Sequence, residues 1–254
     1  MSERGRALRV LLAFAAIYLI WGSTFLAIRV TLRGLPPVLL CALRLLLAAA
    51  LLLAWTWRRG APRPTRREAA NAALAGLLLP GAGNTAVTLA ETHVPSGLVA
   101  LLVATIPLWV AVLGALGRRG VPPPPRALLG LALGFGGIAL LLAPAAGAGG
   151  ARIPVVWALL PVAGALSWAW GSLWSSRARL PRSPLVSTGI GLAAGGLALL
   201  ALAAPLGEYA RFAPARVPAA AWLALLYLVG FGSVIGYTAY LYLLREVAPT
   251  RVAT

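Results

Sequence analysis

A single arginine lies deep within one of the long apolar runs of the sequence, and it is the first candidate for chemistry. Arg44 stands seven residues after Pro37 and thirteen before Trp57. Inside lipid a cation costs several kcal/mol unless it is paired or hydrated. We therefore expect Arg44 to face the interior of a helix bundle, at a binding site or in a structural pair. The alternative, a side chain that extends to the interface, suits a residue closer to the end of the run.

Glu91 is the acidic residue that best matches Arg44 as a counterpart. It comes just after the third apolar run, and His93 and Pro95 follow it. A partly buried carboxylate has a raised pKa, so Glu91 could bind a proton for coupling. The alternative is a solvated loop residue beside the start of a helix, and His93 is interpreted as a loop histidine.

Two further residues inside apolar runs are candidates to line a substrate cavity. Asn84 has a polar side chain that needs a partner, on a neighbouring helix or on a substrate. Pro107 removes a backbone hydrogen bond and leaves a carbonyl that could face a cavity. Mid-run prolines also occur at Pro80 and Pro161, and simple helix kinks are the alternative interpretation for all three.

Aromatic residues offer a wall for organic substrates. Tyr237 and Tyr240 are three residues apart and share a helix face. They combine with a set of tryptophans, namely Trp21, Trp168, Trp170 and Trp174. Tryptophan and tyrosine also form belts at membrane interfaces, so both interpretations stay open. We favour the cavity for Trp21 and Trp170.

Several enzyme classes are excluded by the composition. There is no lysine and therefore no Walker A motif, and there is no aspartate. Cys41 is the one cysteine and His93 the one histidine, so we expect no catalytic set, no metal site and no cofactor. An intramembrane enzyme would need polar groups clustered near one interface, where only Glu91 and His93 qualify.

The elements that must position these residues are membrane-spanning helices. The chain has 254 residues, 61% of them hydrophobic and 11% charged, and its mean hydropathy is +0.89. Runs of about 20 apolar residues are long enough to cross ~30 Å of hydrocarbon as helices. We therefore predict an all-α integral membrane protein. Eight spans are expected, at residues 10–28, 37–57, 69–89, 95–116, 127–143, 154–174, 184–204 and 218–244.

The arginines predict the orientation of the chain. With a cytoplasmic N-terminus, 16 of the 22 arginines fall on the cytoplasmic side and five outside, and Arg44 lies within a span. Positive residues concentrate in cytoplasmic loops, so this orientation is favoured. The net charge of +17 therefore reports topology, and no nucleic-acid partner is expected. The lipid bilayer is the expected partner.

An internal repeat organises the chain. Trp21-Gly22-Ser23 recurs as Trp170-Gly171-Ser172, an offset of 149 residues. The stretch 94–100 resembles 248–254 at an offset of 154. Each repeat then holds five spans, and because five is odd the second copy enters the membrane from the opposite side. Residues 1–143 form the first repeat, 144–153 a periplasmic linker, and 154–254 the second.

The second repeat matches only part of the first. Pro249, the counterpart of Pro95, stands five residues before the last residue of the sequence. We therefore expect a C-terminally truncated repeat, eight spans and the start of a ninth, and a complete protein of ten helices with about 45 further residues. An eight-span mature protein is the alternative.

These motifs resemble the drug/metabolite transporter superfamily and, within it, EamA-type permeases. The similar stretches are Ile20-Trp21-Gly22-Ser23-Thr24-Phe25, Arg44 with the run after it, Val94-Pro95-Ser96-Gly97, Thr105-Ile106-Pro107-Leu108-Trp109, and Gly236-Tyr237-Thr238-Ala239-Tyr240 leading to Ala248-Pro249-Thr250. The resemblance covers nearly the whole chain. It implies ten helices in two five-helix repeats, a bacterial inner membrane, and export or exchange of metabolites, amino acids or drugs.

The expected function is a secondary transporter of small organic molecules that works by alternating access. A flippase for lipids or lipid-linked sugars shares this architecture, and an intramembrane lipid-modifying enzyme is a weaker alternative. Proton coupling and assembly as a homodimer stay open.

Overall fold

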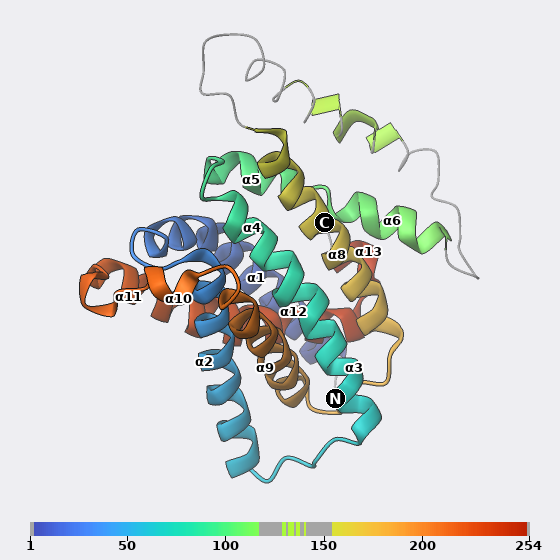
Figure 1. Cartoon of the computed structure of the whole chain (residues 1–254). Coiled ribbons are helices and arrows are strands. Elements are labelled where there is room, and N and C mark those ends of the chain that lie inside the picture. The colour runs from blue at the N-terminus through green and yellow to red at the C-terminus, as the bar shows by residue number, and fades with distance from the viewer. Residues whose placement is uncertain are drawn as a thin grey trace.

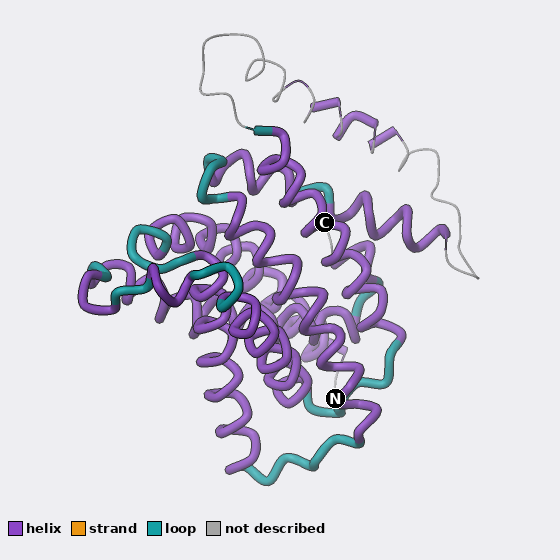
Figure 2. Tube along the Cα trace, viewed as in Figure 1, coloured by secondary structure: helices purple, strands orange, loops and turns teal. Residues whose placement is uncertain are grey.

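The chain folds into a bundle of helices, shown in Figure 1, and the computed structural model describes residues 3–116, 129–130, 132–134, 136–137, 140 and 154–252. Within that part every regular element is a helix (Figure 2). In the first half these are α1 (Glu3–Thr31), α2 (Pro37–Arg58), α3 (Arg66–Gly76), η1 (Leu77–Asn84), α4 (Thr85–Ala90), α5 (Ser96–Val103) and α6 (Ile106–Leu116). In the second half they are α8 (Val155–Arg177), α9 (Pro184–Ala203), α10 (Glu208–Arg211), η2 (Pro214–Arg216), α11 (Ala219–Tyr227), η3 (Leu228–Ile235), α12 (Gly236–Glu246) and α13 (Pro249–Val252).

Seven stretches of the described chain are long and apolar enough to cross a membrane. They match seven of the eight predicted spans, and the remaining one, 127–143, lies largely outside the described residues. The fourth predicted span, 95–116, matches the stretch Ser96–Leu116, and its helix is interrupted at Ala104 and Thr105, just before Pro107, the proline expected to break the helical hydrogen bonds. Proline lacks the N–H that a continuous helix would use, so α5 ends and α6 begins there.

The starts of the spans follow from local sequence. Pro37 and Pro184 occupy the first turns of α2 and α9, where a missing N–H costs nothing. Thr65 and Glu68 form a capping box at the start of α3, in which the Glu68 amide donates to the Thr65 hydroxyl at 3.3 Å.

The helices pack in pairs that join the two halves of the chain. Helix α2 packs along α9. Helix α1 runs beside α11, η3 and α12, whereas α8 runs beside α3, η1 and α4. The third span of each half therefore packs against the first span of the other half.

Both of these third spans contain a π-helical stretch of eight residues. The first is η1 and the second is η3, and their starts, Leu77 and Leu228, are 151 residues apart (228 − 77). A π-helix breaks the regular hydrogen-bond ladder and is frequent at functional sites. Pro80 explains the irregularity in η1. The stretch η3 contains no proline, but it contains two glycines, Gly230 and Gly232.

Loops that the arginine count assigns to one side of the membrane lie at one end of the bundle. The Asn71 side-chain amide donates to the Arg179 carbonyl at 2.9 Å, and Arg245 Nη1 donates to the Arg182 carbonyl at 2.8 Å. At the same end Arg6 forms an ion pair of 2.6 Å with Glu246. The start of α1, the start of α3, the end of α12 and the 178–183 loop therefore lie at the same end of the bundle.

Glycines allow the backbones of α3 and α9 to touch. A Cβ on Gly76 would collide with the backbone of Gly191, and one on Gly195 would lie 2.9 Å from the Gly76 carbonyl oxygen. The four-residue spacing of Gly191 and Gly195 thus produces the close helix contact typical of such pairs.

We expect Gly76→Ala to lower the free energy of unfolding by about 3 kcal/mol, because the obstructing atoms are backbone and cannot rotate away. Thermal unfolding of the purified chain in detergent measures the change. The matched control is Gly114→Ala in α6, where a Cβ would meet nothing within 4 Å. Equal stability of the two variants would contradict the close contact.

At the other end of the bundle, Glu208 holds the start of α2. Its carboxylate is 2% exposed and accepts hydrogen bonds from the amides of Val38 at 3.2 Å and Leu39 at 2.7 Å. These amides belong to the first turn, where no helix carbonyl is available. The contact joins the 204–218 loop of the second half to the first half.

Glu208→Ala is therefore expected to cost about 1–2 kcal/mol of stability, since it leaves two buried amides without acceptors. Glu208→Gln keeps one acceptor oxygen and should lose less. The thermal unfolding midpoints of the three proteins in detergent give the order, and an alanine variant as stable as the unmodified chain would disprove the capping role.

Candidate functional site

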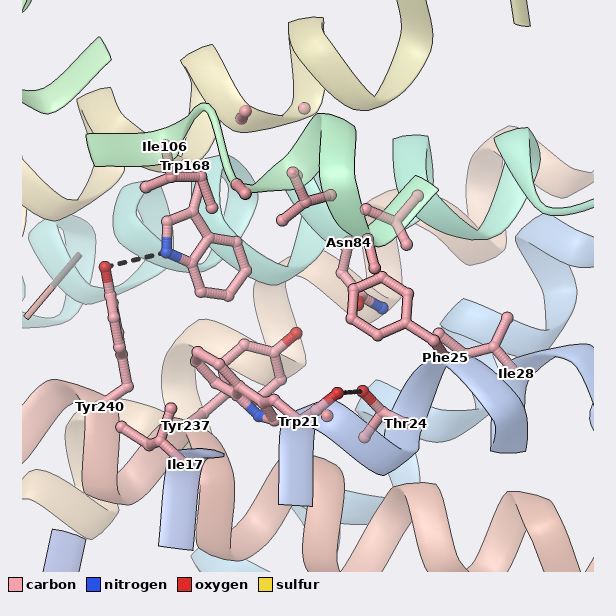
Figure 3. A pocket seen from close by; sticks show the side chains of 18 of the residues that line it. Ile17, Trp21, Thr24, Phe25, Ile28, Asn84, Ile106, Trp168, Tyr237 and Tyr240 are labelled. Atoms are coloured by element: carbon pink, nitrogen blue, oxygen red, sulfur yellow. Dashed lines mark hydrogen bonds between the residues drawn. The ribbon is translucent and has the colours of Figure 1, made fainter. Parts of the chain in front are cut away.

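A cavity of about 400 Å³ lies between the two halves of the chain. Its walls come from α1, α2, η1, α4, α5 and the start of α6 in the first half and from α8, α12 and Val252 of α13 in the second half. Figure 3 shows its side chains, most of which are apolar. The volume lies toward the lower end of the range for small-molecule sites, about 300–1,000 Å³.

Four aromatic rings form one wall of the cavity. Trp21 contacts Trp168 at 5.3 Å between ring centroids, with the planes at 89°. Tyr237 lies 5.6 Å from Trp21 and 5.9 Å from Trp168. Tyr240 lies 5.3 Å from Trp21 and 5.4 Å from Trp168. We define these four residues as the aromatic wall; its members come from α1, α8 and α12, so it joins the two halves.

Hydrogen bonds fix the orientation of this wall. Trp168 Nε1 donates to the Tyr240 hydroxyl at 2.9 Å, the bond drawn in Figure 3. The Tyr240 hydroxyl also bonds the Ser172 hydroxyl at 2.7 Å. Trp21 Nε1 donates to the Gly232 carbonyl at 3.2 Å. With these polar atoms engaged, the rings of Trp21, Trp168 and Tyr240 present apolar faces to the cavity.

Arg44 reaches the cavity from α2 and is 1% exposed. Its Nε donates to the Ser233 hydroxyl at 2.8 Å, and its guanidinium carbon lies 6.0 Å from the centre of the Tyr237 ring. Its Nη1 is buried and has no hydrogen-bond partner. The interior position expected for Arg44 is therefore what the structure has.

Two glycines of the second half make room for the side chains of this site. A Cβ on Gly232 would lie 2.9 Å from Arg44 Nη2, and one on Gly236 would collide with the Trp21 indole. This pair has the same four-residue spacing as Gly191 and Gly195 but accommodates side chains of other helices instead of a backbone.

Asn84 also lines the cavity, at the end of η1 (Figure 3). Its Nδ2 is buried without a hydrogen-bond partner. The neighbouring helices therefore give this amide nitrogen no hydrogen-bond acceptor.

Trp170 lies away from this cavity, contrary to expectation. It is 60% exposed and lines a second hollow of about 610 Å³ with Trp174, Arg67, Asn71 and other residues. Two residues along a helix turn the side chain by about 200°, so Trp168 points inward where Trp170 points outward. In the second copy of the repeated tripeptide, it is Gly171 and Ser172 that are buried.

Pro107 does not line the cavity itself. Its neighbours Ala104 and Ile106 do, at the break between α5 and α6. Pro107 thus acts through the backbone, because it ends the hydrogen-bond ladder where the chain passes the cavity.

Glu91 lies outside the cavity, just beyond the end of α4, and it does not pair with Arg44. Its side chain is fully buried, and neither carboxylate oxygen has a hydrogen-bond partner. Its backbone carbonyl accepts a hydrogen bond from Arg29. Burial raises the pKa of Glu91 to about 8, although the nearby Arg29 charge opposes the shift. Glu91 sits at the end of its span whereas Arg44 lies deep in α2, which explains why the expected pair does not form.

His93 stacks on Trp157, with ring centroids 3.8 Å apart and planes at 10°. The Thr92 hydroxyl contacts His93 Nδ1 at 2.6 Å. His93 lies in the connection between α4 and α5, the loop position interpreted from the sequence. In the described part of the chain no three His, Cys, Asp or Glu residues gather as metal ligands would.

Sequence reasoning missed two hydroxyls of this site. Ser172 holds Tyr240, and Ser233 holds Arg44. Ser172 was visible as the last residue of the repeated Trp-Gly-Ser tripeptide, but Ser233 has no signal in the sequence beyond its place between two glycines.

Comparisons with known proteins all find similarity to transporters where a function is named. The sequence model of the EamA-like transporter family matches residues 8–143 and 155–254. The inner membrane transporter YedA of Escherichia coli (strain K12) is 38% identical over 239 residues, which cover 93% of this chain and 74% of that protein. A transporter of Archaeoglobus fulgidus is 29% identical over 248 residues, covering 95% of this chain and 82% of that one. One crystal structure aligns with a TM-score of 0.68 at 27% identity, over 96% of this chain and 83% of the other.

Proposed function

The chain belongs to the EamA-like transporter family, and on that premise we propose that it is a secondary transporter that moves small organic molecules across a membrane by alternating access. The cavity between the halves carries the proposal. Residues of the first half and of the second half both line it, so a rocking motion of one half against the other would expose it to either side.

The proposed alternation rests on an inverted repeat of two five-helix units, residues 1–143 and 154–254. Two separate ranges of the chain match the same family model. The π-helical stretches η1 and η3 occupy corresponding places, and the pairing of α1 with α12 has its counterpart in the pairing of α8 with α4. Such a relation between halves is what an internal two-fold axis produces.

Within the cavity we assign different roles to the two kinds of side chain. The aromatic wall of Trp21, Trp168, Tyr237 and Tyr240 contacts the apolar part of the substrate. Asn84 and Arg44 contact its polar part, because each keeps an unpaired donor. We assign no substrate contact to Trp170.

Glu91 is the proposed proton carrier. It is buried, its carboxylate has no partner, and its pKa of about 8 lies close to physiological pH. A group with such a pKa changes protonation when its surroundings change modestly. Arg29, which already contacts the Glu91 backbone, is the cation that would stabilise the ionised form.

We further propose that the protein lies in a bacterial inner membrane with a cytoplasmic N-terminus. The relative YedA is named an inner membrane transporter. The end of the bundle that carries Arg6, the 59–65 loop and the 178–183 loop is rich in arginine, which favours the cytoplasmic side for that end.

Reconstitution tests the proposal. Purified protein in liposomes should take up at least one solute from a panel of labelled amino acids, organic acids and hydrophobic amines, saturably and faster than protein-free liposomes do. The same uptake is measured with and without an imposed pH gradient. Absence of uptake across the panel, together with scrambling of a fluorescent phospholipid, would instead favour a lipid translocator.

A further inference from the structure

Arg44 carries a charge that no acidic side chain balances. The guanidinium is 1% exposed, and no carboxylate of the described residues lies within the 4.0 Å of a salt bridge. The side-chain atoms that face it are neutral, namely the Ser233 hydroxyl and the Tyr237 ring. A buried cation in this situation is costly unless an anion joins it.

Two buried polar atoms of the cavity lack a hydrogen-bond partner, and both are donors. Arg44 Nη1 and Asn84 Nδ2 are both buried, and neither has a partner in the structure. Both residues line the same cavity, and neither guanidinium nor amide nitrogen can accept a hydrogen bond. A ligand that satisfies both must therefore offer acceptors, and a carboxylate offers two oxygens that match the planar fork of arginine.

The rest of the cavity is apolar and aromatic. The aromatic wall begins beside Arg44, at the Tyr237 ring, and the polar atoms of Trp168, Tyr240 and Trp21 are already engaged in hydrogen bonds. The wall therefore favours an apolar body over a second polar group.

We propose that the substrate is an organic anion, a carboxylate on an apolar or aromatic body, whose carboxylate binds Arg44 and Asn84. This inference rests on the proposed transport function and specifies its substrate class. Arg44 supplies the charge that selects an anion, and Asn84 adds one neutral hydrogen bond.

Three probes of nearly equal size separate charge from shape: 3-phenylpropionate, its amide 3-phenylpropanamide, and 3-phenylpropylamine. Each probe is titrated into the full chain in lipid nanodiscs, and binding is followed by the change in tryptophan fluorescence. Direct binding of the radiolabelled probes checks the dissociation constants. The unmodified protein should bind the carboxylate at least about tenfold more tightly than the amide, and bind the amine most weakly.

Arg44→Gln should weaken carboxylate binding by about tenfold or more and leave amide binding within about twofold. Arg44→Lys keeps the charge and should retain part of the preference, which guards against a variant that fails to fold. Asn84→Ala should weaken carboxylate binding by about threefold. The matched control is Arg33→Gln, which removes an exposed arginine from the loop before α2.

Four results would overturn the inference: equal binding of carboxylate and amide by the unmodified chain, tightest binding of the amine, equal losses for both probes in Arg44→Gln, or no binding of any probe. None of them decides the transport proposal. That proposal stands or falls on uptake across the wider solute panel in liposomes.

Discussion

Replacing Trp168 with alanine is expected to lower the initial rate of solute uptake by about tenfold or more. Trp168 contacts the three other rings of the aromatic wall and is 9% exposed. Its indole N–H also fixes the Tyr240 hydroxyl. Truncation removes a large apolar face from the cavity and one of the two hydrogen bonds that hold the Tyr240 hydroxyl. Loss of a central aromatic contact commonly costs more than about 2 kcal/mol of binding free energy.

Trp170→Ala provides the matched control, because it removes the same side chain two residues away on the same helix. Trp170 is 60% exposed and lies outside the cavity, so uptake should stay within about twofold of the unmodified rate. Initial rates in liposomes, normalised to the amount of folded protein after size-exclusion chromatography, give the comparison. A larger loss for Trp170 than for Trp168 would mean that the cavity is not the substrate path.

The positions of the spans follow from the sequence because lipid imposes a simple rule on the backbone. Every N–H and C=O in the hydrocarbon needs an internal partner, so an apolar run of sufficient length becomes a helix. The run predicted at 37–57 is helix α2 (Pro37–Arg58), and the run predicted at 184–204 is α9 (Pro184–Ala203). The π-helical stretch η3 could not be predicted in this way, since no proline marks it.

The site could be predicted in part. The cost of a charge in lipid identified Arg44 without any structure, and the three-residue spacing put Tyr237 and Tyr240 on one face. The partner of Arg44 could not be inferred from this cost, because the cost says that a buried cation needs a partner but not which residue supplies it, and Ser233 lies 189 residues further along the chain. Similarly, the repeated tripeptide singled out Trp170 as a cavity residue. Which tryptophan is buried depends on how α8 is rotated about its axis against η1, and in this rotation Trp168 is the buried one.

Glu91→Gln is expected to abolish a loss of thermal stability that the unmodified chain shows as the pH rises. The pKa of Glu91 is raised from 4.5 to about 8 by burial, so between these values the carboxyl is protonated in the folded chain and ionised in the unfolded chain. The unfolded state then binds fewer protons, and the free energy of unfolding falls as pH increases through this window. At about 1.4 kcal/mol per pH unit the whole window corresponds to at most about 5 kcal/mol.

Thermal unfolding midpoints in detergent from pH 5 to pH 9 measure this effect. The unmodified protein should lose stability up to about pH 8 and then level off, whereas Glu91→Gln should show a flatter profile, because a neutral amide has no proton to lose. Glu246→Gln, which removes the partner of Arg6 at the opposite end of the bundle, is the control and should keep the slope of stability against pH.

In liposomes the same Glu91→Gln variant should also remove the dependence of uptake on an imposed pH gradient. A variant that keeps both the stability slope and the gradient dependence would show that the proton is carried elsewhere.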